Sequence, residues 1–434
     1  MGLDCWEHAS LFEIIRALQP GVSVQAEDRA PGDREVGVLK VSSVANGQFH
    51  PEESKAVVSQ DIEKLRLSPK AGDVLISRAN THDLVGASCH VDRDYPQLFL
   101  PDKLWRVALR DSERDSSRWL AHVLRLPSVR RALLALATGT SGSMKNVSQT
   151  AFLRIRVPRP SRQEQDGIED VLSLHDELAK ELENLIQLKC RLKQGLMQQL
   201  LTGKRRFHQF VRNNQSYTTR FGQFPEDWPQ VEIGQIARQV SERPDDLDTL
   251  TVLSCTKYRG LVDSLEYFGK KVFSEVTSEY KLVRRGQFAY ATNHIEEGSI
   301  GLLLRRDSAL VSPMYTVFET LGCAYAPFMY ALFKTELYRH IFSANTNASV
   351  NRRGGLRWAQ FAKIAVALPS LEEQKEIAKV FATCDREIEL LECDLKLLNK
   401  QKSWLMTKLL TGEIRLQMRT MKSPSPVTLE RNSV

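Results

Sequence analysis

The 434-residue sequence has little of the chemistry that marks secreted, zinc-binding or membrane-spanning proteins. Its seven cysteines include no Cys-x-x-Cys pair, which argues against a disulfide framework and against a structural zinc site. No apolar run approaches the ~18 residues of a membrane-spanning helix, and the N-terminus shows no secretory signal pattern. We therefore expect a cytoplasmic protein with no metal site and no membrane contact.

Catalytic motifs are missing as well. The sequence has no phosphate-binding loop, no Gly-x-Gly-x-x-Gly, and no Asn/Asp-Pro-Pro-Tyr/Phe of the kind that amino-methylating DNA enzymes use. One nuclease-like spacing exists, because Asp263 precedes Glu279 and Lys281 at a distance that could gather all three around a metal. This spacing also arises by chance in a charged chain, so we expect a non-catalytic protein and keep a self-sufficient nuclease as an alternative.

What the sequence does contain is one segment written twice. Residues 160–206 and 369–415 match at a constant offset of 209 positions, without insertion or deletion. Both copies open with Pro-Ser-x-x-Glu-Gln, at Pro160 and Pro369, and both close with Leu-Leu-Thr-Gly, at Leu200 and Leu409. A fixed offset indicates selection on shape, because a single insertion turns every later helical residue onto another face.

Each copy predicts a long helix of about 39 residues, or ~58 Å. Ser161 with Glu164 forms a predicted start signal, Ser370 with Glu373 repeats it, and the closing glycine is a predicted stop. The 3-4 spacing of apolar residues favours two helices packed as a coiled coil. The predicted seam comprises Ile168, Leu172, Ala179, Leu182, Ile186, Leu196 and Leu200, interrupted by His175, Lys189 and Lys193, and in the second copy Ile377, Phe381, Cys384, Ile388, Leu391, Leu395, Leu398, Leu405 and Leu409, interrupted by Lys402.

Two stretches of similar length, 1–159 and 207–368, lie outside the repeats and read as mixed α+β globules. They share weaker similarities: Trp6, Leu11 and Ile14 have the spacing of Trp228, Ile233 and Ile236. Predicted strands include 36–44 and 250–256, and predicted helices include 117–137 and 328–342. The end of the chain, 416–434, lacks apolar periodicity and predicts a disordered tail.

Charge is distributed unevenly along the chain. Residues 163–201 hold eight acids and four bases, and residues 372–410 hold eight acids and seven bases. The formal charge of +7 therefore combines helices that carry −5 with a remainder that carries +12. A positive surplus on the globules suits a polyanionic partner, because lysine and arginine neutralise phosphates and release counterions.

Polar loops at corresponding places in both globules are candidate DNA-reading elements. Residues 78–82 (Arg-Ala-Asn-Thr-His) and 290–294 (Tyr-Ala-Thr-Asn-His) each follow a predicted strand, and their arginine, asparagine and histidine side chains can pair with base edges. Local hydrogen bonding is the plainer interpretation of each single residue. Residues 204–206 (Lys-Arg-Arg) could touch phosphates, although we favour a contact with the helix C-terminal dipole. The predicted DNA-binding set is Arg78, Asn80, Thr81, His82, Lys103, Arg106, Lys145, Asn146, Tyr290, Asn293, His294, Tyr315, Asn351, Arg352 and Arg353.

The chain resembles the specificity subunits of type I restriction-modification systems over nearly its whole length. The resemblance rests on the two Pro-Ser-x-x-Glu-Gln openings, the two Leu-Leu-Thr-Gly closings, and the segments 72–78, 224–228 and 311–315. It implies an α+β fold in which two mixed α/β target recognition domains alternate with two long α-helices that form an antiparallel coiled coil, with a pseudo-two-fold internal repeat. The first globule lacks the Pro-x-x-Trp entry of residues 225–228, so we expect its first strand to be shortened or rearranged.

The resemblance also implies a domain plan and a set of partners. Residues 1–159 and 207–368 would be target recognition domains, 160–206 and 369–415 the helical spacer, and 416–434 a tail. The implied partners are double-stranded DNA with a bipartite site, two methyltransferase subunits and restriction/translocase subunits. No cofactor is expected in this chain, whereas S-adenosylmethionine, ATP and Mg would act in the partner subunits. A coiled-coil scaffold with two ligand-binding globules and no DNA remains the alternative.

Overall fold

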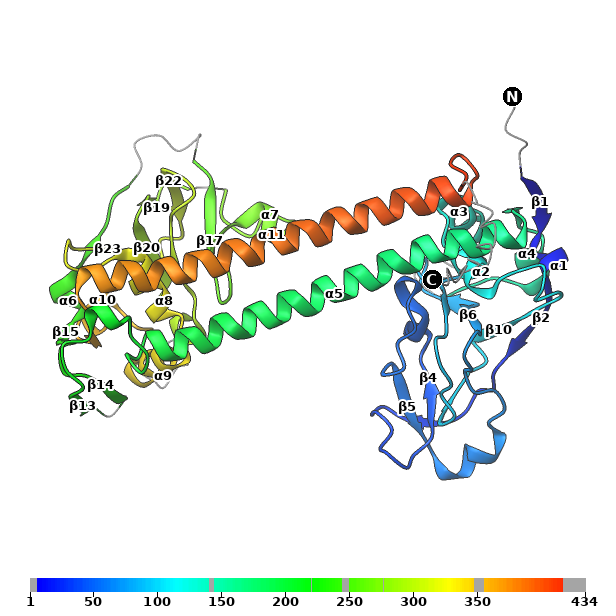
Figure 1. The fold of residues 1–434 in the computed structure, drawn as a ribbon, viewed down its shortest axis with the longest axis horizontal. Coiled ribbons are helices and arrows are strands. Elements are labelled where there is room, and N and C mark those ends of the chain that lie inside the picture. Colours follow the sequence, from blue (N-terminus) through cyan, green and yellow to red (C-terminus); the bar gives the residue numbers. More distant parts are fainter. Residues whose placement is uncertain are drawn as a thin grey trace, which may run out of the picture. The chain divides into compact units, whose positions relative to one another are not determined.

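The computed structural model describes residues 6–139, 144–219, 221–243, 250–275, 277–346 and 355–416. They form two compact units, each of which combines a globular part with one half of each of the two long helices (Figure 1). Unit 1 comprises residues 1–182 and 394–434, and unit 2 comprises residues 183–393. This division runs through both helices, because the helix pair contributes to each core.

Unit 1 contains short strands and helices followed by the first half of a long helix. In chain order its elements are β1 (Glu7–Ser10), α1 (Leu11–Ile14), β2 (Ile15–Pro20), β3 (Ala26–Glu27), β4 (Gly37–Leu39), η1 (Val41–Gly47), β5 (Ser54–Val57), η2 (Ser59–Lys64), β6 (Val74–Ser77), β7 (Ala79–Asn80), β8 (Ser88–His90), β9 (Leu98–Phe99), β10 (Leu104–Leu109), α2 (Ser117–Leu124), α3 (Pro127–Leu136), β11 (Lys145–Asn146), α4 (Gln149–Leu153), β12 (Arg156–Arg159) and the start of α5 (Arg162–Leu200).

Unit 2 repeats this plan and adds a hairpin at its beginning. After the end of α5 its elements are η3 (His208–Phe210), β13 (Ser216–Thr219), β14 (Gly222–Pro225), β15 (Gln230–Glu232), α6 (Ile233–Ile236), β16 (Ala237–Val240), β17 (Val252–Thr256), β18 (Gly260–Asp263), α7 (Ser264–Phe268), β19 (Lys281–Arg284), β20 (Gln287–Ala291), η4 (Ile295–Glu297), β21 (Ile300–Leu302), β22 (Ser308–Val311), β23 (Tyr315–Thr320), α8 (Ala326–Phe333), α9 (Glu336–Asn345), α10 (Trp358–Phe361), β24 (Ala365–Ala367) and the start of α11 (Leu371–Leu410).

The first sheet has the same strand order in both units: β2-β10-β6-β8 in unit 1 corresponds to β16-β23-β20-β21 in unit 2. The second sheets share three strands, β5-β4-β9 and β18-β17-β22, which include one parallel pair each, β4 with β9 and β17 with β22. A fourth strand is added at opposite edges, β3 beside β5 in unit 1 and β19 beside β22 in unit 2. The similarity between the globules that the sequence predicts is therefore a repeat of topology. The predicted α+β fold class is confirmed.

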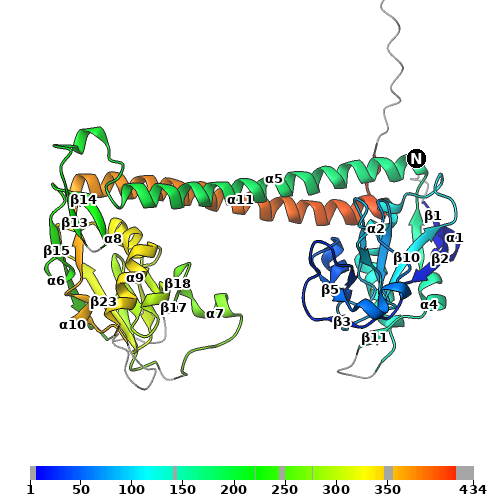
Figure 2. The same cartoon turned by 90° about the horizontal axis from the view of Figure 1, so that it is seen from below.

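The two long helices confirm the predicted repeats almost to the residue. Helix α5 covers 39 residues and α11 covers 40. The start of α5 and the end of α11 pack in unit 1, where Ile168 and Leu172 share a core with Leu409 and Leu410. In unit 2 the end of α5 packs against the start of α11, so the pairing is antiparallel in both units (Figure 2).

The predicted seam is the side of each helix with reduced exposure. Along α5, the positions from Ile168 to Leu200 with 3-4 spacing are buried or half-buried, and between residues 174 and 188 all the residues that separate them are exposed. The three lysines that interrupt the seam form ion pairs across it: Lys189 lies 2.7 Å from Glu387, Lys193 pairs with Asp385, and Lys402 pairs with Asp176. These pairs make other registers unfavourable, because a shift would separate the opposite charges.

A buried glutamine fixes the start of each long helix. Gln165 Oε1 accepts a hydrogen bond from Ser116 N (2.8 Å), and its amide nitrogen donates to the carbonyls of Arg114 and Pro160. Gln374 makes the corresponding bonds with Tyr325 N (2.8 Å) and with the carbonyls of Cys323 and Pro369. Ser116 and Tyr325 are the N-caps of α2 and α8. The repeated glutamine therefore joins the start of α5 to the N-terminus of α2, and the start of α11 to the N-terminus of α8.

The closing residues of each repeat complete a corner that contains a tryptophan. In unit 2, Trp228 Nε1 donates to Glu373 (3.1 Å), and Arg206 binds the same carboxylate at 2.8 Å and Asp227 at 2.7 Å. The Arg206 side chain is 7% exposed and bound to two acids, so the predicted contact with the helix dipole is wrong for Arg206. Lys204 and Arg205 are exposed, and the prediction remains open for them.

The corner of unit 1 also combines a tryptophan, an acid and an arginine, and Glu164 and Arg415 keep the offset of 209 from Glu373 and Arg206. Trp6 Nε1 donates to Glu164 (3.2 Å), and the Arg415 guanidinium lies over the Trp6 ring at 5.5 Å, as Arg206 lies over Trp228. Ser161 and Glu164 form the complete capping box, as predicted. In unit 2 the Ser370 hydroxyl caps the helix, but the Glu373 carboxylate is engaged by Arg206 and Trp228.

Other local predictions differ in detail. The predicted strand at 36–44 is the short β4, which ends at Leu39 because a 3-10 helix begins at Val41. Each predicted globular helix is two helices, with Pro127 starting the second in unit 1. The first strand of unit 1, β1, has four residues and pairs with β12, as the three-residue β15 pairs with β24 in unit 2, so the predicted shortening or rearrangement of this strand is wrong. Among the described residues the hairpin β13–β14 before the tryptophan occurs in unit 2 alone. The tail lies outside the described residues beyond Leu416. A search of the described helices finds none with the length and apolarity needed to cross a membrane.

Candidate nucleic-acid interface

In unit 1 the fold joins two of the predicted polar loops. Strands β7 and β11 pair antiparallel, with Lys145 opposite Asn80 and Asn146 opposite Ala79. The backbone of Arg78 also bonds to Lys103 O (3.0 Å) and to Val147 N (3.0 Å). Residues that are distant in the sequence therefore lie together at the end of strand β6, where the chain leaves the sheet.

The side chains of this cluster differ in exposure. Thr81, His82 and Asn146 are exposed, and the His82 ring is 65% exposed with Nδ1 3.0 Å from Asp83. Asn80 is 5% exposed, accepts a hydrogen bond from Thr81 N (2.8 Å) and donates to Ser77 Oγ (3.3 Å). Local hydrogen bonding, the plainer interpretation of such residues, thus describes Asn80, while His82 and Asn146 are open to a ligand.

Basic side chains around this cluster have partners within unit 1. Arg78 lies 3.4 Å from Asp102, Lys145 donates to Gly139 O (2.6 Å), and Lys103 is half-buried. Arg106 lies on β10, where its guanidinium donates to Gln19 Oε1 at 2.9 and 3.0 Å. Arg78 could exchange Asp102 for phosphate, because an exposed ion pair contributes only about 0–1 kcal/mol.

In unit 2 the corresponding loop follows β20. Asn293 and His294 are exposed, and the His294 side chain is 64% exposed. Thr292 O accepts from Leu356 N (2.9 Å), and Thr292 Oγ1 donates to Met314 O (3.2 Å). Leu356 follows closely on Asn351, Arg352 and Arg353, which lie outside the described residues. The strand registers align Ile76 with Tyr290, and therefore Arg78 with Thr292.

The two predicted tyrosines are less accessible than the loop. Tyr290 is 0% exposed and packs against Phe318 and Phe361 in the core of unit 2. Tyr315 is half-buried at the start of β23, and its hydroxyl accepts from Cys255 N (3.3 Å). Burial raises the pKa of both phenols above its usual value, so both are neutral donors or acceptors at physiological pH.

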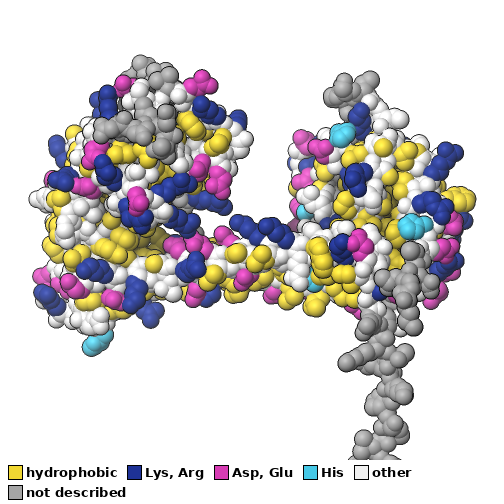
Figure 3. Space-filling model, turned by 90° about the horizontal axis from the view of Figure 1, so that it is seen from above, with side chains coloured by type: hydrophobic (Ala, Val, Ile, Leu, Met, Phe, Trp, Pro, Cys, Tyr) yellow, Lys and Arg dark blue, Asp and Glu magenta, His cyan; other side chains and the backbone are white. Residues whose placement is uncertain are grey.

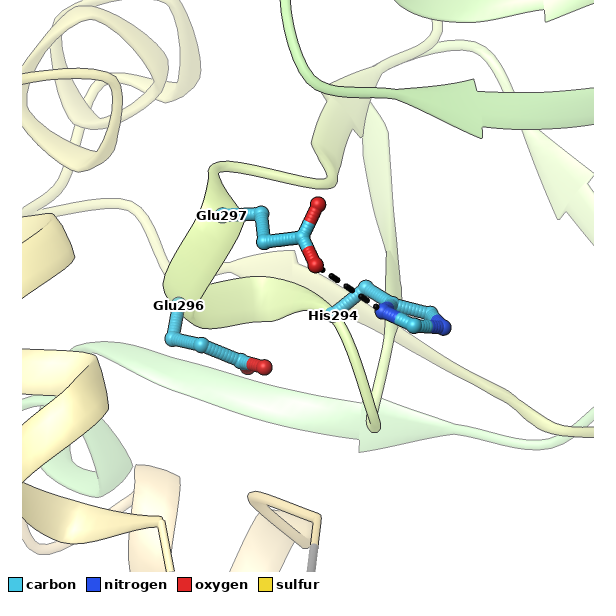
Figure 4. Close-up of side chains that lie close together, drawn as sticks. All are labelled: His294, Glu296 and Glu297. Carbon is cyan, nitrogen blue, oxygen red and sulfur yellow. Dashed lines mark hydrogen bonds and ion pairs between the residues drawn. The ribbon is translucent and has the colours of Figure 1, made fainter.

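The loop of unit 2 also gathers three potential metal ligands (Figure 4). One ligand atom from each of His294, Glu296 and Glu297 lies within 4.8 Å of the others, and His294 Nδ1 is 3.4 Å from Glu297. Two of these side chains are exposed, and the carboxylates come from the short helix η4. The contact between His294 and Glu297 places an acid directly beside this potential reading residue.

The three residues of the nuclease-like spacing each have a separate partner. Asp263 caps α7 and lies 3.5 Å from Arg306, while Glu279 lies 2.9 Å from Arg243. Lys281 Nζ donates to Tyr315 O at 2.6 Å, and burial lowers its pKa. These contacts assign the three side chains to three local structural roles.

Prediction from sequence missed two groups of residues. The tryptophan corners were missed because the partners are far apart in the chain, although the matched offset of Arg206 and Arg415 was a usable signal. The second group is the basic and aromatic turn at Lys257, Tyr258 and Arg259, whose alternation of cation and ring was visible in the sequence.

The fold and the paired polar loops define a class of protein with two topologically equivalent globules on a duplicated helix frame. Residues 264–400 match the family described as "Type I restriction modification DNA specificity domain". The chain is similar to the EcoEI specificity subunit of Escherichia coli (26% identity over 44% of this chain) and to the putative MjaX specificity subunit of Methanocaldococcus jannaschii (20% identity over 95% of this chain). The first match covers 33% of the relative, and the second covers 94%.

Solved structures agree at the level of the fold. The type I restriction-modification S subunit from M. genitalium superposes with a TM-score of 0.54 at 15% identity, covering 94% of this chain and 97% of that one. A chain from a study of assembly and conformational transition of the type I R-M system gives a TM-score of 0.53 at 13% identity, covering 95% of this chain and 99% of that one. The resemblance to the specificity subunits of type I restriction-modification systems is confirmed.

Proposed function

We propose that this chain is the non-catalytic subunit that reads a bipartite duplex site for a type I restriction-modification complex. Each unit contributes one reading edge, formed by the loops around Asn80 and Lys145 in unit 1 and around Asn293 and His294 in unit 2. The observation that carries the proposal is the repeat itself, because the same loop leaves the same strand of the same sheet in both units. A basic surplus of +12 outside the helices supports a polyanionic ligand.

The exposed residues of both edges suit base readout. Asparagine pairs with adenine in the major groove, and histidine and threonine can bond to several base edges. Figure 3 shows lysine and arginine side chains distributed over both globular parts, as phosphate positioning requires. The scaffold without DNA, our second candidate, accounts for the helices but not for this repetition of exposed polar loops on basic globules.

The helix pair is the proposed platform for the partner subunits. Besides the seam, α5 exposes a second set of leucines with 3-4 spacing, and α11 exposes apolar residues every seventh position. In unit 2, Leu185, Leu188 and Leu192 are 39%, 59% and 54% exposed. Because 3-4 spacing is the pattern that another helix covers, we assign this face to a helix of a methyltransferase subunit. S-adenosylmethionine, ATP and Mg would then act in the methyltransferase and restriction subunits.

The test of DNA reading is selection of duplexes from a random library by the full chain with its methyltransferase partner. We expect two short conserved blocks separated by a fixed gap, with binding that weakens steeply as salt rises. His82→Ala should relax one block only and His294→Ala the other. Enrichment of no sequence, or relaxation of both blocks by either variant, would contradict the assignment.

The docking face is tested by a pair of matched variants. Leu188→Asp should lose the methyltransferase subunit and leave the melting temperature unchanged, because the side chain is exposed. Leu391→Asp should lose both, because it places a charge in the half-buried seam. Co-purification and thermal melting separate the two outcomes, and docking retained by Leu188→Asp would refute the assigned face.

A further inference from the structure

An exposed aromatic and basic surface of unit 2 has no role in the function described so far. The turn between β17 and β18 consists of Lys257, Tyr258 and Arg259, and it closes where Thr256 pairs with Gly260. Tyr258 is 82% exposed, the highest value among the large apolar and aromatic side chains of the described residues. A tyrosine held this far into solvent at a hairpin tip contributes nothing to the core of unit 2.

Helix α7 extends this surface beside the hairpin. Its Leu265, Tyr267 and Phe268 are 55%, 45% and 43% exposed. The Arg259 guanidinium lies 6.0 Å from the centre of the Tyr267 ring, so the turn and the helix are in contact. The exposed Lys270 and Lys271 follow directly. Cations interleaved with rings thus form one continuous surface, which we call the hairpin patch (residues 257–259, 265–268, 270 and 271).

The charge of the hairpin patch is positive where it meets solvent. Asp263, at its base, accepts hydrogen bonds from Leu265 N and Glu266 N and pairs with Arg306. Its negative charge is therefore already balanced by the helix N-terminus and an arginine. The exposed Glu266 remains as an acid among four cations. A phosphate-bearing ligand fits this composition, because the cations can neutralise phosphates and the rings can pack on sugars and bases.

Lys334 connects the hairpin patch to the reading loop. Its ammonium group donates to Thr256 O (3.4 Å), Lys257 O (2.8 Å) and Gly298 O (2.7 Å). Gly298 ends the short helix that His294 begins. Burial lowers the pKa of Lys334 to about 8, in keeping with an ammonium enclosed by backbone carbonyls. The turn at Lys257 is therefore fixed next to the loop that carries Asn293 and His294.

We propose that the hairpin patch is a second DNA contact of unit 2, in which Lys257 and Arg259 bind phosphates and Tyr258 packs against the sugars or base edges beside the half-site that Asn293 and His294 read. The proposal rests on the proposed function and adds residues to the same interface. Exposed rings with cations over their faces are a common way to hold a nucleic-acid strand, since the ring packs on the sugar and base while the cation neutralises the phosphate.

Unit 1 has no such contact at the corresponding place. Between β4 and β5 it has the 3-10 helix Val41–Gly47, with Ser43 and Val44 buried, and the segment ends in Glu52 and Glu53. The described residues of this segment place no aromatic side chain between two cations. The proposal therefore predicts that the two half-sites depend differently on phosphate contacts.

The experiment measures binding of the full chain to a labelled duplex with the selected site and to a scrambled duplex, over a range of salt concentrations. Arg259→Ala and Lys257→Ala should each reduce the slope of log K against log salt by about one and weaken both duplexes alike. Tyr258→Ala should weaken binding roughly tenfold without changing the slope. Arg212→Ala removes an exposed cation from the segment before β13 and is the matched control.

The outcomes distinguish failure of the proposed DNA-reading function from failure of the hairpin patch alone. If the unaltered chain binds neither duplex, the proposed function fails. If it binds and Arg259→Ala behaves like Arg212→Ala, only the hairpin patch is refuted. All four variants change exposed or half-exposed side chains, so thermal melting should match that of the unaltered chain. If a variant melts early, Arg259→Lys, which keeps the charge, decides between loss of fold and loss of contact.

Discussion

The tryptophan corners of the two units both combine a tryptophan, an acid and an arginine, but they differ in burial and in the distance between the arginine and the acid. In unit 2, Arg206 and Glu373 are 7% and 1% exposed and lie 2.8 Å apart, with Asp227 as a second acid. In unit 1, Arg415 and Glu164 are 30% and 24% exposed and lie 4.0 Å apart. A repeat can therefore conserve the identity of an interaction while its energy differs, because the energy depends on how far water is excluded.

The cores differ in the same direction. Unit 2 packs Phe288, Phe318, Phe333 and Phe361 around one centre, with the Phe288 and Phe318 rings stacked at 4.6 Å. The core of unit 1 is mainly aliphatic around Trp105 and Trp119. Topology and helix ends are shared, whereas core chemistry and the loops are not. This pattern is expected when a duplicated fold is kept for its helices and sheets while the loops of each globule change independently.

The largest expected effect comes from breaking the buried corner. Glu373→Ala leaves Arg206 buried with one remaining acid, and this should cost about 3–5 kcal/mol. Glu164→Ala removes a less buried partner that also closes the capping box and accepts from Trp6, and it should cost about 1–2 kcal/mol. Hydrogen-deuterium exchange resolved by peptide in mild urea measures each unit separately. Equal effects in the two units would contradict the difference in burial.

A second effect distinguishes the units by pH. Burial lowers the pKa of His90 to about 4 and that of His122 to about 3, whereas His208, His294 and His340 of unit 2 are exposed. At a pH below the unfolded histidine pKa of about 6.5, these two rings are protonated in the unfolded chain but remain neutral in the folded chain. Unit 1 should be fully stable above that pH and lose stability as pH falls towards 4.

His122 sets the expected loss of stability at low pH and provides a variant that tests its cause. Its ring should contribute a loss on the order of 2 kcal/mol at pH 5. We expect peptides of unit 1 to exchange faster at pH 5 than at pH 7.5 after correction for intrinsic rates, and peptides of unit 2 to change little. His122→Gln should remove about half of the acid sensitivity, because His90 retains the rest, while His294→Gln should leave it unchanged. Equal acid sensitivity of both units would show that the buried histidines are not its source.

The smallest effect sharpens the comparison at the helix ends. Gly203 and Gly412 have φ values of +69° and +77°, which are unfavourable for other residues. A Cβ at Gly203 would lie 2.5 Å from Pro225, whereas a Cβ at Gly412 would lie 3.2 Å from Trp6. Gly203→Ala should therefore destabilise by about 1 kcal/mol more than Gly412→Ala. Exchange of peptides at the two helix ends provides the measurement, and the opposite order would refute the steric argument.

The sequence predicted the frame because the frame is periodic. The heptads and the constant offset locate α5 and α11, and the order of loop and strand signals places Asn80 and Asn293 after equivalent strands. Exposure of the individual side chains was not predictable. Tyr290 lies in a strand whose five residues are all buried, and the Asn80 side chain is buried against the backbone of its own loop. The segments that cover these side chains are distant in the sequence, so no local pattern indicated their burial.

The corners escaped prediction for the same reason. Each combines a tryptophan near the start of a globule, an acid at the beginning of one helix and an arginine beyond the end of the other. No local pattern relates these three positions. The hairpin patch was different, since residues 257–259 carried a local signal that a search limited to matched loops overlooked.

The corners have a consequence for how such chains can change in length. Every long helix is anchored at both of its ends, by its glutamine and acid at the first turn and by its glycine and arginine after the last. One extra residue would rotate the far anchor by about 100° and move it by about 1.5 Å. Natural variants that lengthen or shorten one long helix should therefore change the other by the same number of residues, so the lengths of the two helices should vary together.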